Sequence, residues 1–314
     1  MEEKLIKDLG IEFFPIKCGK LRRYFSWENF LDFFKFIIGI FQSYFLIRKI
    51  KPDLLFSKGG YVSLPVVIGA YLRSVPVYIH ESDLSPGLAN KISSKFADKI
   101  FLSFPESKDY FSKFKGEIIV TGTPIREELF QGNKEKALKF LKFESKKPIL
   151  FIIGGSLGAS QINNLVKNSF KELCEKFNIV HQSGSGKSLA LKDPSYREFP
   201  FIKEEFSDIL AVSDLVVSRA GSNSLFEMAL LRKKAVIIPM EAGRGDQVEN
   251  AEIFSKELSW PVLKGEISVQ DFLKSISIAM SEKIKASDKF KNGAETISLN
   301  ILKNENSNKW KSLN

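Results

Sequence analysis

Short apolar runs alternate with helix-like stretches along most of this chain. The run 149–153 is apolar at every position, which is typical of a strand buried on both faces of a sheet. By contrast, 160–176 repeats apolar residues every three or four positions, as a helix with one buried face does. Strands separated by helices indicate parallel sheets built from βαβ units. The pattern therefore predicts an α/β protein.

The same pattern predicts strands in both halves of the chain. Those expected in the first half are 12–16, 54–57, 75–79, 99–102 and 118–121, and those in the second half are 149–153, 179–182, 214–218 and 235–239. The main helices are expected at 27–50, 62–72, 160–176, 222–231 and 246–258. The charged, lysine-rich stretch 131–148 separates the halves, so we expect two Rossmann-like domains, 1–135 and 146–302, that face a cleft.

Composition narrows the class of protein. The chain has 314 residues, of which 44% are hydrophobic and 27% charged, and this excludes disordered, collagen-like and coiled-coil proteins. Lysine and arginine outnumber the acidic residues by 47 to 37, so an anionic partner is expected: phosphate, an anionic membrane or nucleic acid. The basic residues are scattered and form no stripe interleaved with aromatic residues, which makes nucleic acid the least favoured of the three.

Few residues are available to hold a metal. The chain contains two cysteines, Cys18 and Cys174, and two histidines, His80 and His181. An ordinary zinc site needs more such ligands, so we expect neither a metal nor another cofactor. The charged first residues do not resemble a signal peptide, and the apolar stretch 33–47 is too short and too interrupted to span a membrane. Both features predict a cytoplasmic protein.

A glycine-rich loop follows the strand expected at 149–153. Gly154, Gly155 and Gly158 let backbone N–H groups approach an anion at the start of the next helix. The loop is not a dinucleotide-binding fingerprint, because it lacks the further glycines that this motif requires. The spacing favours a cradle for a diphosphate, and the alternative is an ordinary tight turn between strand and helix.

A second glycine-rich stretch is similar to a phosphate-binding P-loop. It ends in Gly186-Lys187-Ser188, but His181 stands where a P-loop requires its first glycine. We therefore expect an ordinary turn with a solvated lysine, and not an ATPase. His181 is expected to pack in the interior.

Two further loops in the second half join a strand to a helix. In the first, Ser222 or Ser224 is expected to cap the helix, while Glu227 either complements the helix dipole or accepts hydrogen bonds from a ligand diol. In the second, Gln247 and Asn250 lie on the early turns of a helix. Three such loops at the carboxyl ends of parallel strands predict a nucleotide site in the second domain.

Polar residues also follow a strand in the first half. His80, Glu81 and Asp83 come directly after the strand expected at 75–79, and they are candidates for acid–base chemistry or hydroxyl contacts. The alternative is that Asp83 and Ser85 only cap the following helix. Arg126, near the seam between the two domains, suits a phosphate.

The helix expected at 27–50 is apolar on nearly every side and is flanked by basic residues. Two interpretations stay open: a fully buried helix, or a membrane-surface patch ringed by positive charge. The net charge of +10 favours the membrane patch.

Seven stretches of the sequence together resemble the MurG family of glycosyltransferases. They are GKLRRYF, SKGGYVSLP, HESDLSPGLANK, TGTPIREEL, IIGGSLGA, DLVVSRAGSNSLFE and GDQVENA, in order along the chain. The resemblance implies a GT-B architecture and inverting transfer of N-acetylglucosamine from UDP-N-acetylglucosamine (UDP-GlcNAc). The implied acceptor is undecaprenyl-diphosphate-linked N-acetylmuramoyl-pentapeptide (lipid I), which becomes lipid II in peptidoglycan biosynthesis. The resemblance also implies no obligatory metal, and a peripheral protein on the cytoplasmic side of the cell membrane.

The resemblance further implies roles for single residues. Arg126 binds the donor, the backbone of Ile202 contacts uracil, Glu227 holds the ribose hydroxyls and Gln247 reads the sugar. The full implied set of substrate-binding residues is Asp83, Asn90, Arg126, Ser156, Ile202, Ser222, Asn223, Ser224, Leu225, Phe226, Glu227 and Gln247, with Gly154, Gly155 and Gly158 in the diphosphate loop. Either Asp83 or Asn90 fills one position in the first domain, and the resemblance does not decide between them.

The sequence departs from the family at one motif. MurG proteins begin with a glycine-rich GGTGGH loop whose histidine is proposed as the general base, and this chain has no such stretch. The first domain is expected to lack about one βαβ unit, roughly 30 residues. Three explanations are a start codon assigned too late, a cloned fragment and a degenerate paralogue, of which we expect the first. His80 and Glu81 are then the candidates for the base, and the alternative function is a non-catalytic UDP-sugar-binding paralogue.

Overall fold

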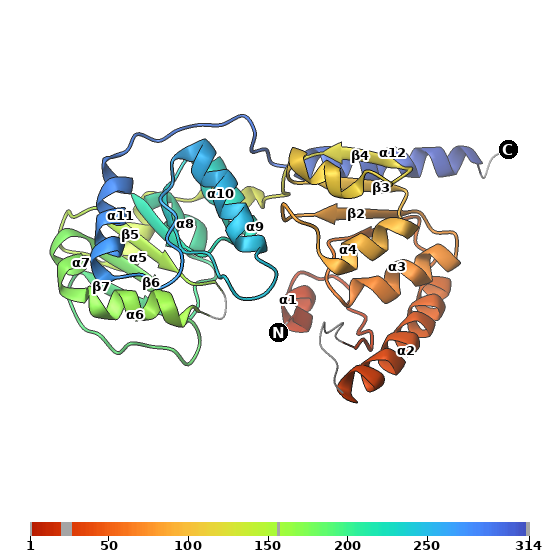
Figure 1. The fold of residues 1–314 in the computed structure, drawn as a ribbon, viewed down its shortest axis with the longest axis horizontal. Helices are drawn as coiled ribbons and strands as arrows, with labels where there is room; N and C mark the ends of the chain where they lie inside the picture. The colour runs from red at the N-terminus through yellow and green to blue at the C-terminus, as the bar shows by residue number, and fades with distance from the viewer. Residues whose placement is uncertain (1, 20–26, 156–157, 312–314) are drawn as a thin grey trace. The chain divides into compact units, whose positions relative to one another are not determined.

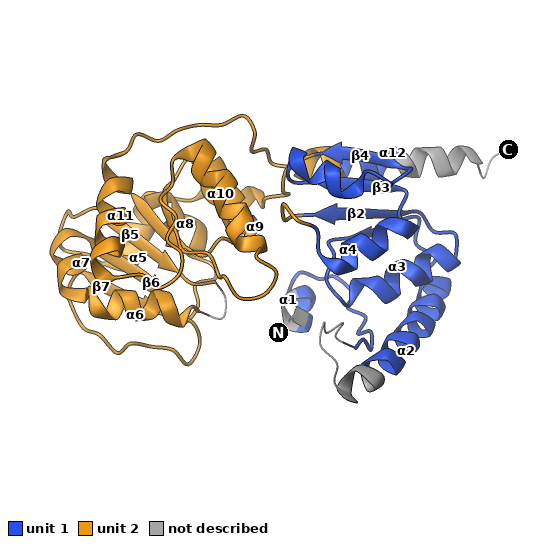
Figure 2. Ribbon diagram, viewed as in Figure 1, with its two compact units in different colours: residues 1–81, 86–120, 298–314 blue, residues 82–85, 121–297 orange. Residues whose placement is uncertain are grey.

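The computed structural model describes residues 2–19, 27–155 and 158–311. The chain forms two compact units: residues 1–81, 86–120 and 298–314 make the first, and residues 82–85 and 121–297 the second (Figure 2). Each unit contains a parallel sheet, which confirms the prediction of an α/β protein. Compactness alone does not define a domain that folds by itself, so the domains expected at 1–135 and 146–302 stay a prediction.

The first unit is built on a sheet of four parallel strands. In sheet order they are β1 (Leu55–Ser57), β2 (Val77–Glu81), β3 (Lys99–Leu102) and β4 (Glu117–Val120). The helices are α1 (Glu2–Asp8), α2 (Trp27–Ile50), α3 (Ser63–Leu72), α4 (Leu88–Ser93) and the 3₁₀ helices η1 (Ser94–Phe96) and η2 (Pro105–Phe111). Figure 1 shows α3 and α4 on the same side of this sheet. Apolar side chains of β2 and β3, such as Ile79 and Ile100, are fully buried in the core between the layers.

Helix α2 lies at the bounds that the sequence predicts, and it packs against α3. Gly69 of α3 approaches α2 so closely that a Cβ there would lie 2.9 Å from the side chain of Ser43. The segment 14–17 contacts part of the rest of α2, but several large apolar side chains of the helix stay exposed, so the interpretation as a fully buried helix is wrong. Its large exposed apolar side chains are Phe33, Phe34, Ile38, Phe41, Phe45 and Ile50. Among the described residues, no helix combines the length and apolar character that crossing a membrane requires.

The second unit is built on a doubly wound sheet of five parallel strands. In sheet order they are β7 (Tyr196–Phe199), β6 (Asn178–Gln182), β5 (Ile149–Ile153), β8 (Leu215–Ser218) and β9 (Lys234–Ile237). The helices are η3 (Glu127–Gln131), α5 (Lys134–Leu141), α6 (Ser160–Asn168), α7 (Phe170–Lys176), α8 (Phe206–Val212), α9 (Ser222–Leu230), α10 (Asp246–Leu258) and α11 (Val269–Ser281), and α12 (Ala294–Lys311) continues into the first unit. The chain leaves β5 toward β6 and later returns to β8 on the other side of β5. The carboxyl ends of β5 and β8 therefore form the switch point at which such sheets bind ligands.

Strand β2 lies two residues later than the strand expected at 75–79, so His80 and Glu81 fall inside it and do not follow it. Three further elements differ from the sequence prediction. The stretch 12–16 is irregular and not a strand, and its Pro15 has no backbone N–H to donate to a sheet. The pattern misses β7, because its sequence Tyr-Arg-Glu-Phe is half polar, as an edge strand allows. The helix expected at 160–176 is divided into α6 and α7 at Ser169, whose hydroxyl donates to the carbonyl of Leu165 at 2.6 Å.

Candidate functional site

The glycine-rich loop between β5 and α6 has the backbone that only glycine adopts readily. Gly155 and Gly158 have φ values of +85° and +67°. A Cβ at Gly154 would collide with the backbone of Ala159, and a Cβ at Gly158 would collide with the carbonyl of Ser183. No side chain caps the start of α6, so backbone N–H groups of its first turn remain for an anion.

Gln182, at the carboxyl end of β6, connects this loop to the segment after β7. Its Nε2 donates to the carbonyl of Gly155 at 3.3 Å, and its Oε1 accepts from the backbone N–H of Ile202 at 2.9 Å. Because that N–H is already bonded, only the carbonyl of Ile202 is a candidate for the expected uracil contact. Gln182 is not among the residues predicted from the sequence, although a polar residue at the end of an apolar strand is a signal for such a role. Ser156, the expected diphosphate contact, lies outside the described residues.

The P-loop-like stretch contacts the glycine-rich loop. The buried His181 places Nδ1 2.8 Å from the Tyr196 hydroxyl and Nε2 3.2 Å from Oδ1 of Asn163. Burial lowers the pKa of His181 to about 4, so the ring is neutral near pH 7. Interior packing of His181 is thus confirmed. Lys187 is not simply solvated, because its Nζ donates to the carbonyl of Gly158 at 3.1 Å.

The helix after β8 begins on a glycine. Gly221 is the N-cap residue of α9 and no side chain caps the helix, so the expectation that Ser222 or Ser224 caps it is wrong. The hydroxyl of Ser222 instead donates to the carbonyl of Ser82. The first turn of α9 therefore offers a second set of backbone N–H groups at the switch point of the sheet.

Four further residues of α9 belong to the implied substrate-binding set. Leu225 and Phe226 are 0% exposed, so only their backbone can reach a ligand. Asn223 is exposed and Ser224 half-buried, and their side chains remain accessible.

The structure brings Glu227 and Arg126 within electrostatic reach of each other. Glu227 is half-buried on α9, and burial raises its pKa while the charge of Arg126 lowers it. Arg126 is exposed at the start of η3. A cation and a carboxylate near each other suit a ligand that has both phosphate and hydroxyl groups.

Gln247 lies on the first turn of α10. Its side-chain Oε1 accepts from the backbone N–H of Met240 at 3.0 Å, so the side chain fastens the loop that precedes the helix. The two amide N–H donors of Gln247 are the groups that can contact a ligand.

Asp83 is bound to α10 and to the loop before it. Its Oδ1 accepts from Nδ2 of Asn250 at 3.0 Å, and its Oδ2 lies 3.3 Å from Nη2 of Arg244, which also pairs with Asp246. Burial raises the pKa of Asp83, and the bonds from Asn250 and Arg244 oppose that rise. Asn250 also accepts from the backbone N–H of Leu84 at 2.9 Å. Arg244 could not be predicted from the sequence, because no local pattern links it to Asp83, 161 positions away.

His80 lies inside the first unit, on β2. Its side chain is 0% exposed, with Nδ1 2.9 Å from Nζ of Lys58 and Nε2 3.4 Å from the Ser103 hydroxyl. The lysine is a donor, so Nδ1 accepts from it. An enclosed imidazole in this arrangement does not favour the expected role of His80 as a general base.

Glu81 and Asn90 fix the turn that follows β2. Oε2 of Glu81 accepts from the N–H of Gly87 at 3.1 Å and from Nδ2 of Asn90 at 2.9 Å, and both side chains are 4% exposed. Nδ2 of Asn90 also donates to the carbonyl of His80 at 3.1 Å. Gly59 lies against the amide of Asn90, at a φ of +87° that favours glycine. These contacts give both residues a structural role.

The groups at the carboxyl end of the second sheet are complementary to a sugar nucleotide. Two uncapped helix starts and Arg126 suit a diphosphate, while Glu227 and Gln247 suit hydroxyl groups. Across the parts of the chain that the structure describes, no group of three or more His, Cys, Asp or Glu side chains could hold a metal ion.

Comparisons with known proteins agree with this fold. Residues 1–102 match the glycosyltransferase family 28 N-terminal domain, and residues 149–298 match the family 28 C-terminal domain. The structure of Acinetobacter baumannii MurG has a TM-score of 0.70 at 24% identity, over 96% of this chain and 88% of that one. A UDP-GlcNAc 2-epimerase from Neisseria meningitidis has a TM-score of 0.68 at 12% identity, with the same coverage. The fold is therefore that of the two-domain family 28 glycosyltransferases and their structural relatives.

Sequence relatives specify the family further. UDP-N-acetylglucosamine--N-acetylmuramyl-(pentapeptide) pyrophosphoryl-undecaprenol N-acetylglucosamine transferase 2 of Bacillus cereus is 47% identical over 305 residues, which are 95% of this chain and 86% of the relative. The transferase of the same description from Clostridium tetani is 45% identical over 308 residues, 95% of this chain and 85% of the relative. The chain belongs to the MurG family.

Proposed function

We propose that this protein transfers N-acetylglucosamine from UDP-GlcNAc to undecaprenyl-diphosphate-linked N-acetylmuramoyl-pentapeptide, with inversion at the anomeric carbon. The observation that carries the proposal is identity of 45–47% to transferases of this description over 95% of the chain. The reaction is the step from lipid I to lipid II in peptidoglycan biosynthesis. The alternative, a non-catalytic UDP-sugar-binding paralogue, has no finding in its favour.

The proposed donor site lies at the switch point of the second sheet. The backbone N–H groups of the glycine-rich loop and of the first turns of α6 and α9 hold the diphosphate, with Ser156 as a further contact. Glu227 accepts from the ribose hydroxyls, Gln247 donates to the sugar, and the carbonyl of Ile202 contacts uracil. Arg126 adds a positive charge near the phosphates.

The reaction breaks the bond between the anomeric carbon and the diphosphate oxygen while the acceptor hydroxyl attacks the same carbon. UDP leaves with an additional negative charge, which the helix starts and Arg126 stabilise more strongly than the neutral sugar linkage. The proton of the acceptor hydroxyl must pass to a base. Because His80 and Glu81 are bonded inside the first unit, we assign the base to neither of them.

The uncovered face of α2 supports membrane attachment as part of this function. Its aromatic side chains are exposed together with Arg48 and Lys49 at the end of the helix. An apolar face with cationic neighbours inserts into the headgroup region of an anionic membrane. We therefore propose peripheral attachment to the cytoplasmic side of the cell membrane, where a lipid-linked acceptor is available, and no nucleic-acid partner.

Release of UDP in the presence of a lipid I acceptor tests the proposed reaction. We expect UDP release that depends on acceptor, together with lipid-linked disaccharide that mass spectrometry identifies. UDP binding in calorimetry without any acceptor-dependent turnover would instead support the non-catalytic paralogue. Arg126→Ala and Gln247→Ala are expected to weaken use of UDP-GlcNAc, and unchanged kinetics in both variants would contradict the site.

A further inference from the structure

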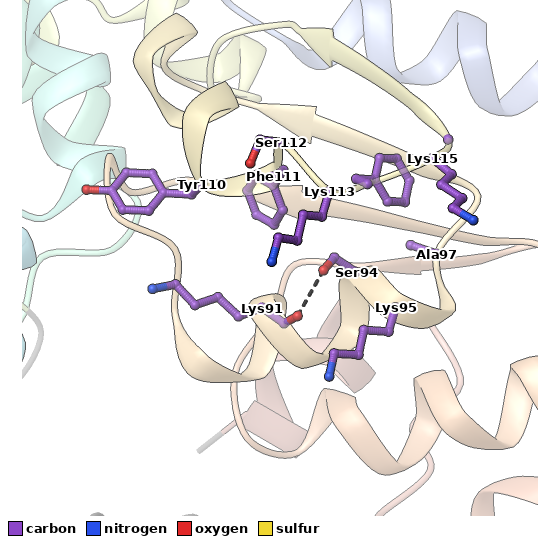
Figure 3. A pocket seen from close by; sticks show the side chains of 11 residues that line it. Lys91, Ser94, Lys95, Ala97, Tyr110, Phe111, Ser112, Lys113 and Lys115 are labelled. Carbon is purple, nitrogen blue, oxygen red and sulfur yellow. Dashed lines mark hydrogen bonds between the residues drawn. The ribbon is translucent and has the colours of Figure 1, made fainter.

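A pocket in the first unit is lined by lysines and contains none of the residues assigned to the donor site. It has a volume of about 520 Å³ and lies between the α4–η1 segment and the loop from η2 to β4. Its basic side chains are Lys91, Lys95, Lys113 and Lys115, all exposed. Figure 3 shows Lys113 extending from the loop into the space in front of α4.

The positive charge of this pocket is not neutralised locally. Residues 91–116 include six lysines and three acidic residues, and no acidic side chain lines the pocket. Within the described parts of the chain, the four pocket lysines form no ion pair, whereas neighbouring Lys99 pairs with Glu117 at 2.7 Å. Ammonium groups around one hollow repel each other, and an anion bound among them lowers that energy.

The remaining lining gives the pocket a defined shape. Phe111 is 4% exposed and belongs to the core beneath the pocket. The ring of Tyr110 lies 5.3 Å from Nζ of Lys91, a distance at which the aromatic face attracts the cation. The Ser94 hydroxyl donates to the carbonyl of Lys91 at 2.8 Å, and Ser112 adds a hydroxyl on the other side. Cations and hydroxyls over an apolar floor suit a compact anion.

We propose that this lysine pocket binds a phosphate or phosphodiester group, carried either by an anionic lipid headgroup or by a soluble molecule. A phosphate group is favoured over a carboxylate because its oxygens accept hydrogen bonds from several ammonium groups at once. The pocket shares no lining residue with the proposed donor site or with the exposed face of α2. Its occupancy does not depend on the proposed transfer reaction.

Lys113→Glu tests the pocket, and Lys108→Glu is the matched control. Lys108 is an exposed lysine of η2 that does not line the pocket, so both variants change the net charge equally. Circular dichroism and thermal unfolding establish that each variant folds like the parent. Calorimetry measures binding of inorganic phosphate with UDP present to fill the donor site. Co-sedimentation measures binding to phosphatidylcholine vesicles with and without phosphatidylglycerol.

We expect Lys113→Glu to weaken binding of at least one probe by about fivefold or more, the effect of one lysine near an anionic surface. The control is expected to change binding by less than about twofold. A loss confined to phosphatidylglycerol vesicles identifies a lipid headgroup, and a loss of phosphate binding identifies a soluble ligand. Equal effects of the two variants would show diffuse attraction and overturn the proposal. Unchanged binding in Lys113→Glu, or no binding of either probe by the parent, would also overturn it.

Discussion

Glu227 supplies a carboxylate to the proposed donor site, and its partial burial disfavours the charged form of that carboxylate. Its pKa is raised by burial, so it takes up a proton at a higher pH than an ordinary glutamate does. If the carboxylate accepts from the ribose hydroxyls, kcat/KM for UDP-GlcNAc falls as the pH falls through this raised pKa. Glu227→Gln is expected to remove that acidic limb and to raise the KM for UDP-GlcNAc about tenfold, because a charge-assisted hydrogen bond is lost.

The pH profile of initial rates at several donor concentrations checks this prediction. Glu204→Gln, which neutralises an exposed carboxylate of the same unit, serves as the control and is expected to keep the parent profile. An acidic limb that persists unchanged in Glu227→Gln would assign it to another group.

Two glycines of the glycine-rich loop allow the cost of a strained backbone to be measured apart from the cost of a steric collision. Gly155 and Gly158 both have positive φ, but a Cβ at Gly155 would meet open space while a Cβ at Gly158 would meet the carbonyl of Ser183. Gly155→Ala is expected to lower the free energy of unfolding by about 1 kcal/mol, and Gly158→Ala by about 3 kcal/mol. Urea unfolding with a common m-value measures both. Equal losses would mean that the loop moves to accommodate either side chain.

At the scale of elements, His181 couples the stability of the β6–β7 edge to pH. Its pKa is about 4 in the folded protein, below the usual value of 6.5. Between these values the unfolded state binds more protons, so stability is full above pH 6.5 and is lost as the pH falls toward 4. The expected loss from this group is about 3 kcal/mol.

The variant His181→Gln checks this linkage. It is less stable at pH 7 because the bonds to Tyr196 and Asn163 change, but its unfolding free energy is expected to vary less between pH 6.5 and pH 4. Denaturant unfolding at a series of pH values gives both slopes. Parallel curves for parent and variant would contradict the role of His181.

Elements with a strong local pattern could be predicted from the sequence. The strand β5 is apolar at every position and the helix α2 is apolar over most of its length, and the structure has both at the expected bounds. Other elements depend on tertiary context. Strand β7 is half polar because it lies at the sheet edge, and the apolar stretch 12–16 has no strand to pair with in the described sheets.

Some features of the candidate site could likewise be predicted from local sequence, and others depend on contacts between distant residues. The glycine-rich loop is recognisable because positive φ and close approach require glycine at particular positions. The network of Asp83, Asn250 and Arg244 joins residues far apart in the sequence, and no local pattern encodes it. Burial of His80 on β2 was also not deducible, since a polar residue at a strand end can lie inside or outside.

At the scale of the whole molecule, the proposed donor contacts lie in the second compact unit, and the α2 face proposed to bind the membrane lies in the first. Variants of the two surfaces should therefore affect different substrates. Arg126→Ala is expected to raise the KM for UDP-GlcNAc about tenfold, since a charge-assisted contact is lost, and to leave vesicle binding unchanged. Phe41→Ser with Phe45→Ser is expected to lower vesicle binding about tenfold through lost apolar burial.

UDP affinity and vesicle binding can both be measured on each variant, so the independence of the donor site and the α2 face can be tested. The α2 double variant should raise the apparent KM for a vesicle-borne acceptor while UDP binding in calorimetry keeps the parent affinity. Leu138→Ser with Phe140→Ser removes two exposed apolar side chains of α5 and controls for a general loss of apolar surface. Vesicle binding reduced equally by both double variants would show that α2 is not the docking face. A lowered UDP affinity in the α2 variant would show that the two surfaces are coupled. If α2 contacts only lipid, substitutions in it do not change the affinity of the donor site for UDP.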